Sequence, residues 1–314
     1  MRRHMWGGWP LALALFLASC AQPAQAPISS PNEPPAQPGG PKPIQPLVPA
    51  PANNGGGGGA TPRPSQLSDD QAVLETSVAG DPSLIVYPTK TLTPGARYPV
   101  MVFFHGYGMD PSQLTARTDL AEAAAAEGWI SAAGAFGGRG HWGNEQALRR
   151  VGALIAELVE KHQADPQRIY LVGFSMGGGT ALLAAANPLG LPYRAAAVVS
   201  TQGFTDLEAM TWSEAGGGTY AEPIASAYGG SLEPQEAEAH SPLSHAQALS
   251  RLPVYLEHGE SDGNVRPSHS RRLAEALTAL GASPEVHYYP GRSHGEDTIG
   301  TSTIMGFLRG KAAP

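Results

Sequence analysis

The chain has 314 residues, of which 41% are hydrophobic and 15% are charged, and its formal net charge at pH 7 is −7. This length is enough for one large domain, or two small ones, with a sizeable hydrophobic core. The excess of acidic residues, with no cluster of basic ones, argues against nucleic acid or an anionic membrane surface as the main partner.

Residues 1–20 have the pattern of an export signal. Two arginines precede an apolar stretch at 11–17, which is too short to span a bilayer and remain there. The tetrapeptide Leu17-Ala18-Ser19-Cys20 resembles the lipobox of bacterial lipoproteins, in which the peptide is cut before a cysteine that is then acylated. Cys20 is the only cysteine in the chain. We therefore expect a lipoprotein signal peptide and a mature protein anchored in the cell envelope without disulfides. The alternative is an ordinary secretory signal that is cut after Ala26.

Residues 21–68 are rich in proline, glutamine and glycine and contain almost no large apolar side chains. Such a segment buries too little surface to fold by itself. We expect a disordered tether with a reach on the order of 40 Å or more, which would hold the rest of the chain away from a membrane. Residues 69–314 remain, and their number suits a single domain.

Residues 69–314 alternate between two kinds of apolar pattern. Short runs typical of buried strands occur at 84–88, 98–104, 129–135, 169–172, 195–200, 254–257 and 285–289. Helical patterns occur at 111–127, 144–162, 176–187, 267–280 and 296–309. Strands that alternate with helices predict an α/β fold, with a mostly parallel sheet covered by helices on both faces. Residues 201–250 are expected to be irregular.

The strongest chemical signal lies between the strand at 169–172 and the helix that follows it. The connection is Gly173-Phe174-Ser175-Met176-Gly177. Small residues two places on either side of the serine permit the sharp turn that lifts its hydroxyl above a sheet. The N-terminus of the following helix also directs unpaired N–H groups at charge that develops on a bound substrate. We interpret this turn as a nucleophile elbow; the alternative is a glycine-rich turn with an incidental serine.

A serine nucleophile needs a general base, and that base needs an acid that orients it and stabilises its cation. In an open parallel sheet, both should lie in loops at the carboxyl ends of later strands. The loop after 254–257 contains Asp262, and the loop after 285–289 contains His294. We therefore predict Ser175, Asp262 and His294 as the catalytic residues. Glu260 is the competing candidate for the acid.

Four other histidines compete less well for the role of base. His287 lies within a strand pattern, and His269 opens a helix. His258 and His105 each precede a glycine at the end of a strand, and we expect them to hold loops together.

The oxyanion of an acyl-transfer intermediate requires two N–H donors. One should be the backbone N–H of Met176, directly after the nucleophile. The other should come from the loop after an early strand, and we assign it to the backbone N–H of Tyr107. A plain turn is the alternative for that loop.

Four motifs, in this order, resemble the α/β-hydrolase superfamily and, within it, the dienelactone-hydrolase and phospholipase/carboxylesterase branches. They are H-G-Y-G at 105–108, G-F-S-M-G-G at 173–178, H-G-E-S-D-G-N-V at 258–265 and G-R-S-H at 291–294. The resemblance covers residues 84–309 and implies the α/β-hydrolase fold and no cofactor. Dienelactone hydrolases use a cysteine where this chain has Ser175, so cleavage of small-molecule carboxylic esters is expected rather than lactone hydrolysis. The sequence has no motif typical of a metal or dinucleotide site.

The same resemblance implies that residues 201–250 decide the substrate. We expect Trp212 and Tyr220 of this segment, with Trp142 on the opposite rim, to line a pocket beneath a partial cap. The alternative is a surface excursion that these aromatic residues only anchor. Two other functions stay open: a peptidase of the prolyl-oligopeptidase type, which has the same triad, and a non-catalytic binding lipoprotein that keeps the fold.

Overall fold

The computed structural model describes residues 71–212 and 220–311. The expected signal peptide with Cys20 and the expected tether at 21–68 lie outside the described residues. Within the described part, the strands are β1 (Ala72–Val78), β2 (Asp81–Tyr87), β3 (Tyr98–Phe104), β4 (Ile130–Gly134), β5 (Ala164–Phe174), β6 (Ala197–Thr201), β7 (Val254–Gly259) and β8 (Glu285–Tyr289).

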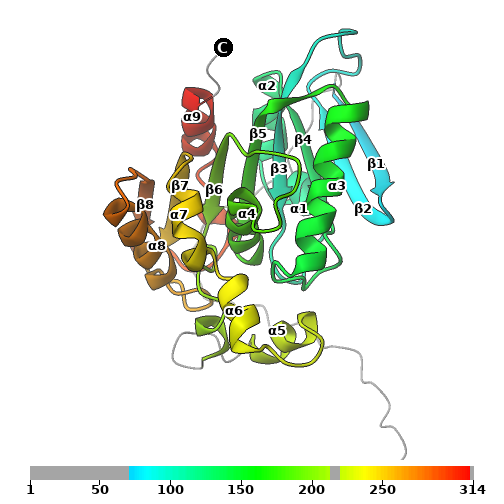
Figure 1. Cartoon of the computed structure of the whole chain (residues 1–314). Coiled ribbons are helices and arrows are strands. Elements are labelled where there is room, and N and C mark those ends of the chain that lie inside the picture. Colours follow the sequence, from blue (N-terminus) through cyan, green and yellow to red (C-terminus); the bar gives the residue numbers. More distant parts are fainter. Residues whose placement is uncertain (1–70, 213–219, 312–314) are drawn as a thin grey trace, which may run out of the picture. The chain divides into compact units, whose positions relative to one another are not determined.

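These strands form one sheet in the order β1-β2-β4-β3-β5-β6-β7-β8 (Figure 1). β1 with β2 and β2 with β4 pair antiparallel, and the other neighbouring pairs are parallel. β3 and β5 are apolar along most of their length because both of their faces are buried. The prediction of a mostly parallel α/β sheet is confirmed.

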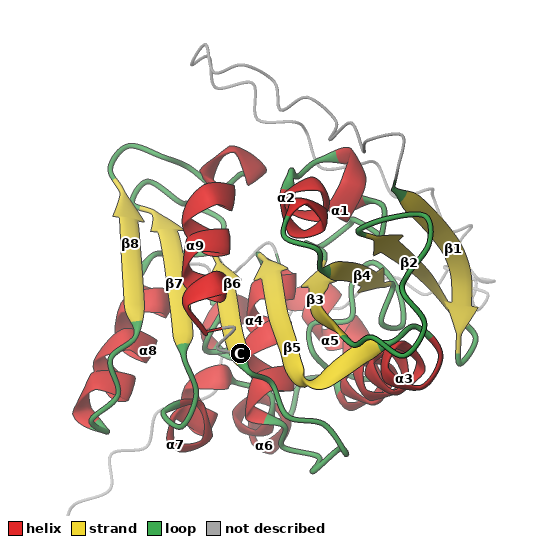
Figure 2. Ribbon diagram, turned by 90° about the horizontal axis from the view of Figure 1, so that it is seen from above, coloured by secondary structure: helices red, strands yellow, loops and turns green. Residues whose placement is uncertain are grey.

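Helices cover both faces of this sheet (Figure 2). On one face lie α3 (Glu145–Lys161), α4 (Met176–Ala186), α7 (Ala246–Leu249) and α8 (Ser268–Ala279), and their apolar residues belong to one core cluster. On the other face lie α1 (Gln113–Ala116), α2 (Leu120–Ala126) and α9 (Thr301–Lys311), which contribute to a second cluster. The sheet therefore separates two hydrophobic cores.

The local sequence explains where the helix α3 begins and which of its faces is buried. Its N-cap, Asn144, accepts a hydrogen bond from the Ala147 N–H at 2.9 Å, which satisfies one of the free donors of the first turn. Apolar side chains at three- and four-residue steps are buried against the sheet: Leu148, Val151, Leu154, Ile155 and Leu158. The helix expected at 144–162 is confirmed.

The single helix expected at 111–127 is wrong, because α1 ends at Ala116 and α2 begins at Leu120. Between them, the Thr118 hydroxyl donates to the Leu114 carbonyl at 2.7 Å. The Leu120 N–H approaches the same hydroxyl at 3.4 Å. A side chain that takes up backbone groups in this way competes with the helical ladder and interrupts it.

Two further differences concern the sheet edge and the segment at 201–250. The edge strand β1 was not expected, because its sequence mixes polar and apolar residues and it pairs only with β2. The segment at 201–250 is not wholly irregular, since it contains α5 (Ala221–Ala227), α6 (Pro234–Ala239) and α7. In Figure 1, α5 and α6 lie together beyond one end of the strands.

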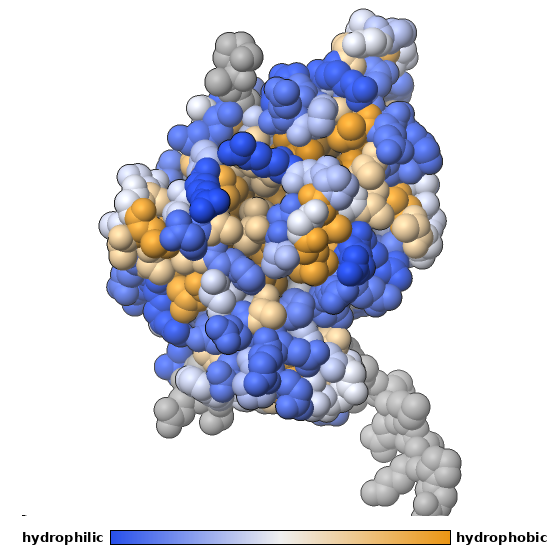
Figure 3. Space-filling view, viewed as in Figure 1, coloured by the Kyte–Doolittle hydropathy of each residue, from blue (hydrophilic) through white to orange (hydrophobic). Residues whose placement is uncertain are grey.

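The face of the molecule shown in Figure 3 is mostly hydrophilic, and its hydrophobic residues form separate small patches. Among the helices of the described residues, none combines the length and the apolar character needed to cross a membrane.

Candidate active site

Ser175 lies in the tight turn between β5 and α4. Its backbone has φ 57° and ψ −122°, a conformation that residues other than glycine seldom adopt. The Ser175 N–H donates to the Thr201 carbonyl at 2.9 Å, which holds the turn against β6. A Cβ at Gly173 would overlap the carbonyl of Gly177, and a Cβ at Gly177 would overlap the carbonyl of Phe104. Both glycines are therefore needed for this turn.

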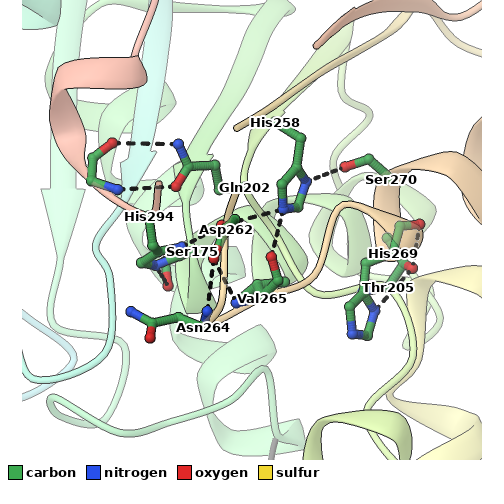
Figure 4. A network of polar contacts seen from close by, with 11 residues as sticks. Ser175, Gln202, Thr205, His258, Asp262, Asn264, Val265, His269, Ser270 and His294 are labelled. Carbon is green, nitrogen blue, oxygen red and sulfur yellow. Dashed lines mark hydrogen bonds and ion pairs between the residues drawn. The ribbon is translucent and has the colours of Figure 1, made fainter. Parts of the chain in front are cut away.

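The structure brings the three residues predicted as catalytic together at the carboxyl ends of β5, β7 and β8 (Figure 4). His294 Nδ1 lies 2.7 Å from Asp262 Oδ2, and His294 Nε2 lies 2.8 Å from Ser175 Oγ. A carboxylate only accepts, so Nδ1 carries the hydrogen and Nε2 of the neutral ring is left to accept the Ser175 proton. The arrangement has the order and the contacts of a Ser-His-Asp triad.

The Asp262 side chain is buried and strongly hydrogen-bonded. Its Oδ1 accepts from the Asn264 N–H at 2.8 Å and the Val265 N–H at 2.9 Å. Burial by itself would raise the pKa of Asp262, but the contacts with His258 and His294, the charge of His294 and the Val265 N–H together outweigh burial and lower this pKa to about 2. Asp262 is thus ionised at neutral pH and able to stabilise a protonated His294. The competing acid, Glu260, instead pairs with Arg271 at 3.0 Å on the surface.

Met176 directly follows Ser175, and a Cβ on Gly106, the residue before Tyr107, would lie 3.6 Å from the Ser175 Cβ. The two N–H groups predicted for the oxyanion are free within the described part of the chain. Met176 is the first residue of α4, so its N–H has no partner inside the helix. In the loop after β3, the Gly106 N–H donates to Gln113 Oε1 at 2.8 Å and the Gly108 N–H donates to the Arg139 carbonyl at 2.8 Å. The Tyr107 N–H between them makes no hydrogen bond to any residue described.

Residues 134–305 match the prolyl oligopeptidase family, and this region is more than half of the chain. The chain belongs to the prolyl oligopeptidase family. The elbow and its partners have the arrangement that a serine hydrolase requires.

One relative is the uncharacterised peptidase YtmA of Bacillus subtilis (strain 168). It is 32% identical over 164 residues, which are 50% of this chain and 61% of that protein. A puromycin-hydrolysing peptidase of Mycobacterium tuberculosis has a TM-score of 0.60 at 23% identity, with 77% of this chain but only 39% of that chain covered. A truncated carbohydrate esterase from gut microbiota has a TM-score of 0.62 at 18% identity, with 78% of this chain and 98% of that chain covered. At these identities the two structures show a shared fold.

In this member of the prolyl oligopeptidase family, the loop that carries His294 is held by side chains from neighbouring strand ends. Gln202, after β6, accepts from the Gly295 N–H at 3.1 Å and donates to the Gly295 carbonyl at 3.4 Å (Figure 4). Glu257, on β7, is buried and accepts from the Gly300 N–H at 3.1 Å. These contacts fix the loop immediately after His294 and again at the start of α9.

Gln113 connects the loop of Tyr107 with the loop of His294. Besides accepting from the Gly106 N–H, it donates to Glu296 Oε1 at 3.0 Å, and its side chain is buried. Glu296 is also paired with Arg117 at 3.1 Å. One buried amide therefore links the loop of Tyr107 to the loop of His294.

Of the three residues predicted to line the pocket, Trp142 and Tyr220 lie together beside Ser175, whereas Trp212 lies elsewhere. The centroid of the Trp142 ring is 5.1 Å from that of Tyr220 and 5.5 Å from that of Tyr107, and the backbone N–H of Trp142 approaches Met176 Sδ at 3.4 Å. Trp142 is only 1% exposed, so it forms a floor under these rings rather than a rim. Trp212 is 55% exposed and lines a separate groove near α5 and α6.

Sequence reasoning missed the supporting roles of Gln202, Gln113 and Glu257, for which no local motif exists. His258 was expected to hold a loop together, and it does so through the Val265 carbonyl at 2.7 Å. Within residues 71–212 and 220–311, no group of three His, Cys, Asp or Glu side chains is arranged to bind a metal ion.

Proposed function

We propose that this protein is a serine hydrolase, and specifically a carboxylesterase that cleaves small carboxylic esters through an acyl-enzyme. In this proposal Ser175 is the nucleophile, His294 the general base and Asp262 the residue that orients the base. The observation that carries the proposal is the continuous hydrogen-bonded chain from Asp262 to His294 to Ser175, at 2.7 and 2.8 Å.

In the first half of the reaction, Ser175 Oγ attacks the ester carbonyl carbon while His294 Nε2 takes the hydroxyl proton. The oxyanion accepts from the N–H groups of Met176 and Tyr107, each worth about 10²- to 10³-fold in kcat. His294 then gives its proton to the departing alcohol oxygen as the carbon–oxygen bond breaks. In the second half, water attacks the acyl carbon, His294 takes the water proton, and Ser175 leaves with the proton restored.

Ester cleavage and peptide cleavage use the same residues, and the peptidase function is supported about as well. The family and the relative YtmA favour a peptidase. The likeness to a truncated form of a carbohydrate esterase, of which 98% is covered, supports an esterase. The aromatic side chains of Tyr107, Trp142 and Tyr220 beside Ser175 suit an apolar acyl group in either case.

The serine nucleophile is tested by Ser175→Ala. This variant should lose hydrolysis of p-nitrophenyl esters and labelling by a fluorophosphonate probe, with its thermal midpoint within about 2 °C of the wild type. Ser261→Ala, at an exposed serine next to Asp262, is the matched control and should keep both activities. A Ser175→Ala variant that still hydrolyses esters would contradict the assignment, and a wild type that the probe does not label would favour a non-catalytic binding protein.

Esterase and peptidase are separated by pairs of substrates with the same acyl group. For each pair of an acyl p-nitrophenyl ester and an acyl p-nitroanilide, kcat/KM is compared after division by the uncatalysed rate. A larger acceleration for the anilides, together with cleavage of short peptides, would replace the esterase proposal by the peptidase.

We also propose that Cys20 is acylated and anchors the protein to a membrane of the cell envelope. This rests on the lipobox-like tetrapeptide alone, since residues 1–70 lie outside the described part of the chain. Mass spectrometry of the mature N-terminus should show a cysteine that carries acyl chains. A mature chain that begins at Pro27 without lipid would overturn this proposal.

A further inference from the structure

A second buried histidine lies behind the acid of the site. In Figure 4, Asp262 lies between His294 on one side and His258 on the other. His258 Nε2 is 3.3 Å from Asp262 Oδ2, the same oxygen that His294 contacts. The side chains of His258 and Asp262 are both fully buried. Water therefore does not screen this contact.

The contacts of His258 determine which of its nitrogens carries a hydrogen. Nε2 lies 2.7 Å from the Val265 carbonyl, which can only accept, so Nε2 carries the hydrogen. That hydrogen is directed at the Val265 carbonyl, and Asp262 Oδ2 lies 3.3 Å from the same nitrogen. Nδ1 lies 2.7 Å from Ser270 Oγ at the start of α8. Both nitrogens of the ring are thus engaged.

The same contacts leave the Asp262 carboxylate no freedom to rotate. Two backbone N–H groups occupy Oδ1, and the two imidazoles meet at Oδ2. Among the contacts that lower the pKa of Asp262 against the effect of burial, the one from His258 is the largest. His258 therefore acts directly on the carboxylate that orients the base.

We propose that His258 is a positioning residue that holds Asp262 Oδ2 toward His294. It also makes this oxygen a weaker hydrogen-bond acceptor, and Ser270 in turn holds His258 in place. The proposal rests on the catalytic roles proposed above for Ser175, His294 and Asp262. It extends the chain of contacts to five side chains, from Ser270 through His258, Asp262 and His294 to Ser175.

Other charged and titratable groups near this chain come from three parts of the fold. His269 and Arg272 belong to α8, Asp206 belongs to the loop after β6, and Tyr220 directly precedes α5; all four act on the same electrostatic environment as His258 or Asp262. None of the four makes a hydrogen bond to Asp262 or His258 within the described residues. His269 is therefore a suitable neighbour for a control substitution.

The test uses two substitutions of His258, of which one keeps an N–H donor near Asp262 and the other does not. His258→Gln replaces the imidazole by an amide whose N–H donor lies near the position of Nε2, so this variant retains the proposed contact. His258→Leu keeps a buried side chain and removes the donor. His269→Asn removes a neighbouring buried imidazole and keeps an acceptor for the Thr205 N–H, which donates to His269 Nδ1 at 3.2 Å in the wild type.

The rate of fluorophosphonate labelling of Ser175 is measured against pH in each folded variant. In His258→Leu, Asp262 becomes a stronger hydrogen-bond acceptor and holds the proton on His294 more tightly. The acidic side of the plot of labelling rate against pH should therefore move to higher pH by about half a unit. Its maximal rate should fall about tenfold because Oδ2 loses one of the two contacts that hold it toward His294. His258→Gln and His269→Asn should match the wild type. A His258→Leu profile equal to the wild type, or a His258→Gln profile equal to His258→Leu, would overturn the proposal.

A second measurement does not depend on reactivity. The proton on His294 Nδ1 should give a low-field nuclear magnetic resonance signal in the wild type and in His258→Gln, and that signal should shift or vanish in His258→Leu. If the wild type does not react with the probe, the proposed function fails, and this signal alone then decides the proposal for His258. An unchanged signal in His258→Leu would refute it.

Discussion

Replacing His269 by asparagine should make the fold less sensitive to acid. His269 lies in α8 and is 2% exposed. Its Nδ1 accepts the Thr205 N–H, which leaves the ring neutral with its hydrogen on Nε2. Burial lowers the pKa of His269 to about 4, and the weaker effects of Asp206 and Asp262, which raise this pKa, do not compensate.

The sign and size of the effect follow from the difference between the folded and the unfolded chain. An unfolded histidine takes up its proton near pH 6.5, whereas His269 in the folded protein does so only near pH 4. Between these values the unfolded chain binds more protons, so the free energy of unfolding falls as the pH falls from about 6.5 to about 4. The full loss is about 3 kcal/mol, of which about 2 kcal/mol is already lost at pH 5.

The assay is urea unfolding of the wild type and His269→Asn at pH 7.5 and at pH 5. The variant loses ring contacts and should be less stable at both values, but its further loss at pH 5 should be about 2 kcal/mol smaller than that of the wild type. Burial also lowers the pKa of His105 and His141, so both proteins keep some sensitivity to acid. Equal losses in the two proteins would refute the assignment to His269.

Two further substitutions test the elbow and the link between the loops. Gly177→Ala should destabilise the protein by at least about 2 kcal/mol, because its Cβ would overlap backbone carbonyls at the end of β3. Gly263→Ala, where a Cβ meets no atom within 4 Å, is its control, and equal midpoints in urea would contradict the argument. Gln113→Met should lower kcat for p-nitrophenyl esters about tenfold with KM within about twofold, because it releases the Gly106 N–H beside the oxyanion donor. An unchanged kcat would show that the loop is held without Gln113.

The sequence was sufficient to predict the fold class and to place the candidate site residues at one edge of the sheet. Gly173 and Gly177 mark the turn locally, and parallel strands end at the same edge, so the loops of Asp262 and His294 could be placed near Ser175 from chain order alone. The supporting contacts could not be predicted in this way. Gln113 reaches Glu296 across 183 positions of the chain, and Gln202 reaches Gly295 across 93. Such pairs depend on how the strands are ordered in the sheet.

The aromatic residues were predicted less well for a related reason. Trp142, Trp212 and Tyr220 looked equivalent in the sequence, because a bulky side chain in a loop carries no periodicity that tells a buried position from an exposed one. The structure separates them, since Trp142 is held under Tyr220 while Trp212 is 55% exposed.

In the proposed function, different parts of the chain would carry out the reaction and select the substrate. Ser175, Asp262 and His294 are held by backbone groups and buried side chains at the strand ends, whereas the rings beside them come from the loops after β3 and β4 and from Tyr220, which directly precedes α5. Within the described residues, Tyr220 packs against Tyr107 and Trp142 and makes no hydrogen bond to a proposed catalytic side chain, so its exchange should alter selectivity between ester and amide without removing Ser175 reactivity. Under the proposed function, these rings are the expected source of any difference between an esterase and a peptidase, because either reaction would use the same nucleophile, base and acid.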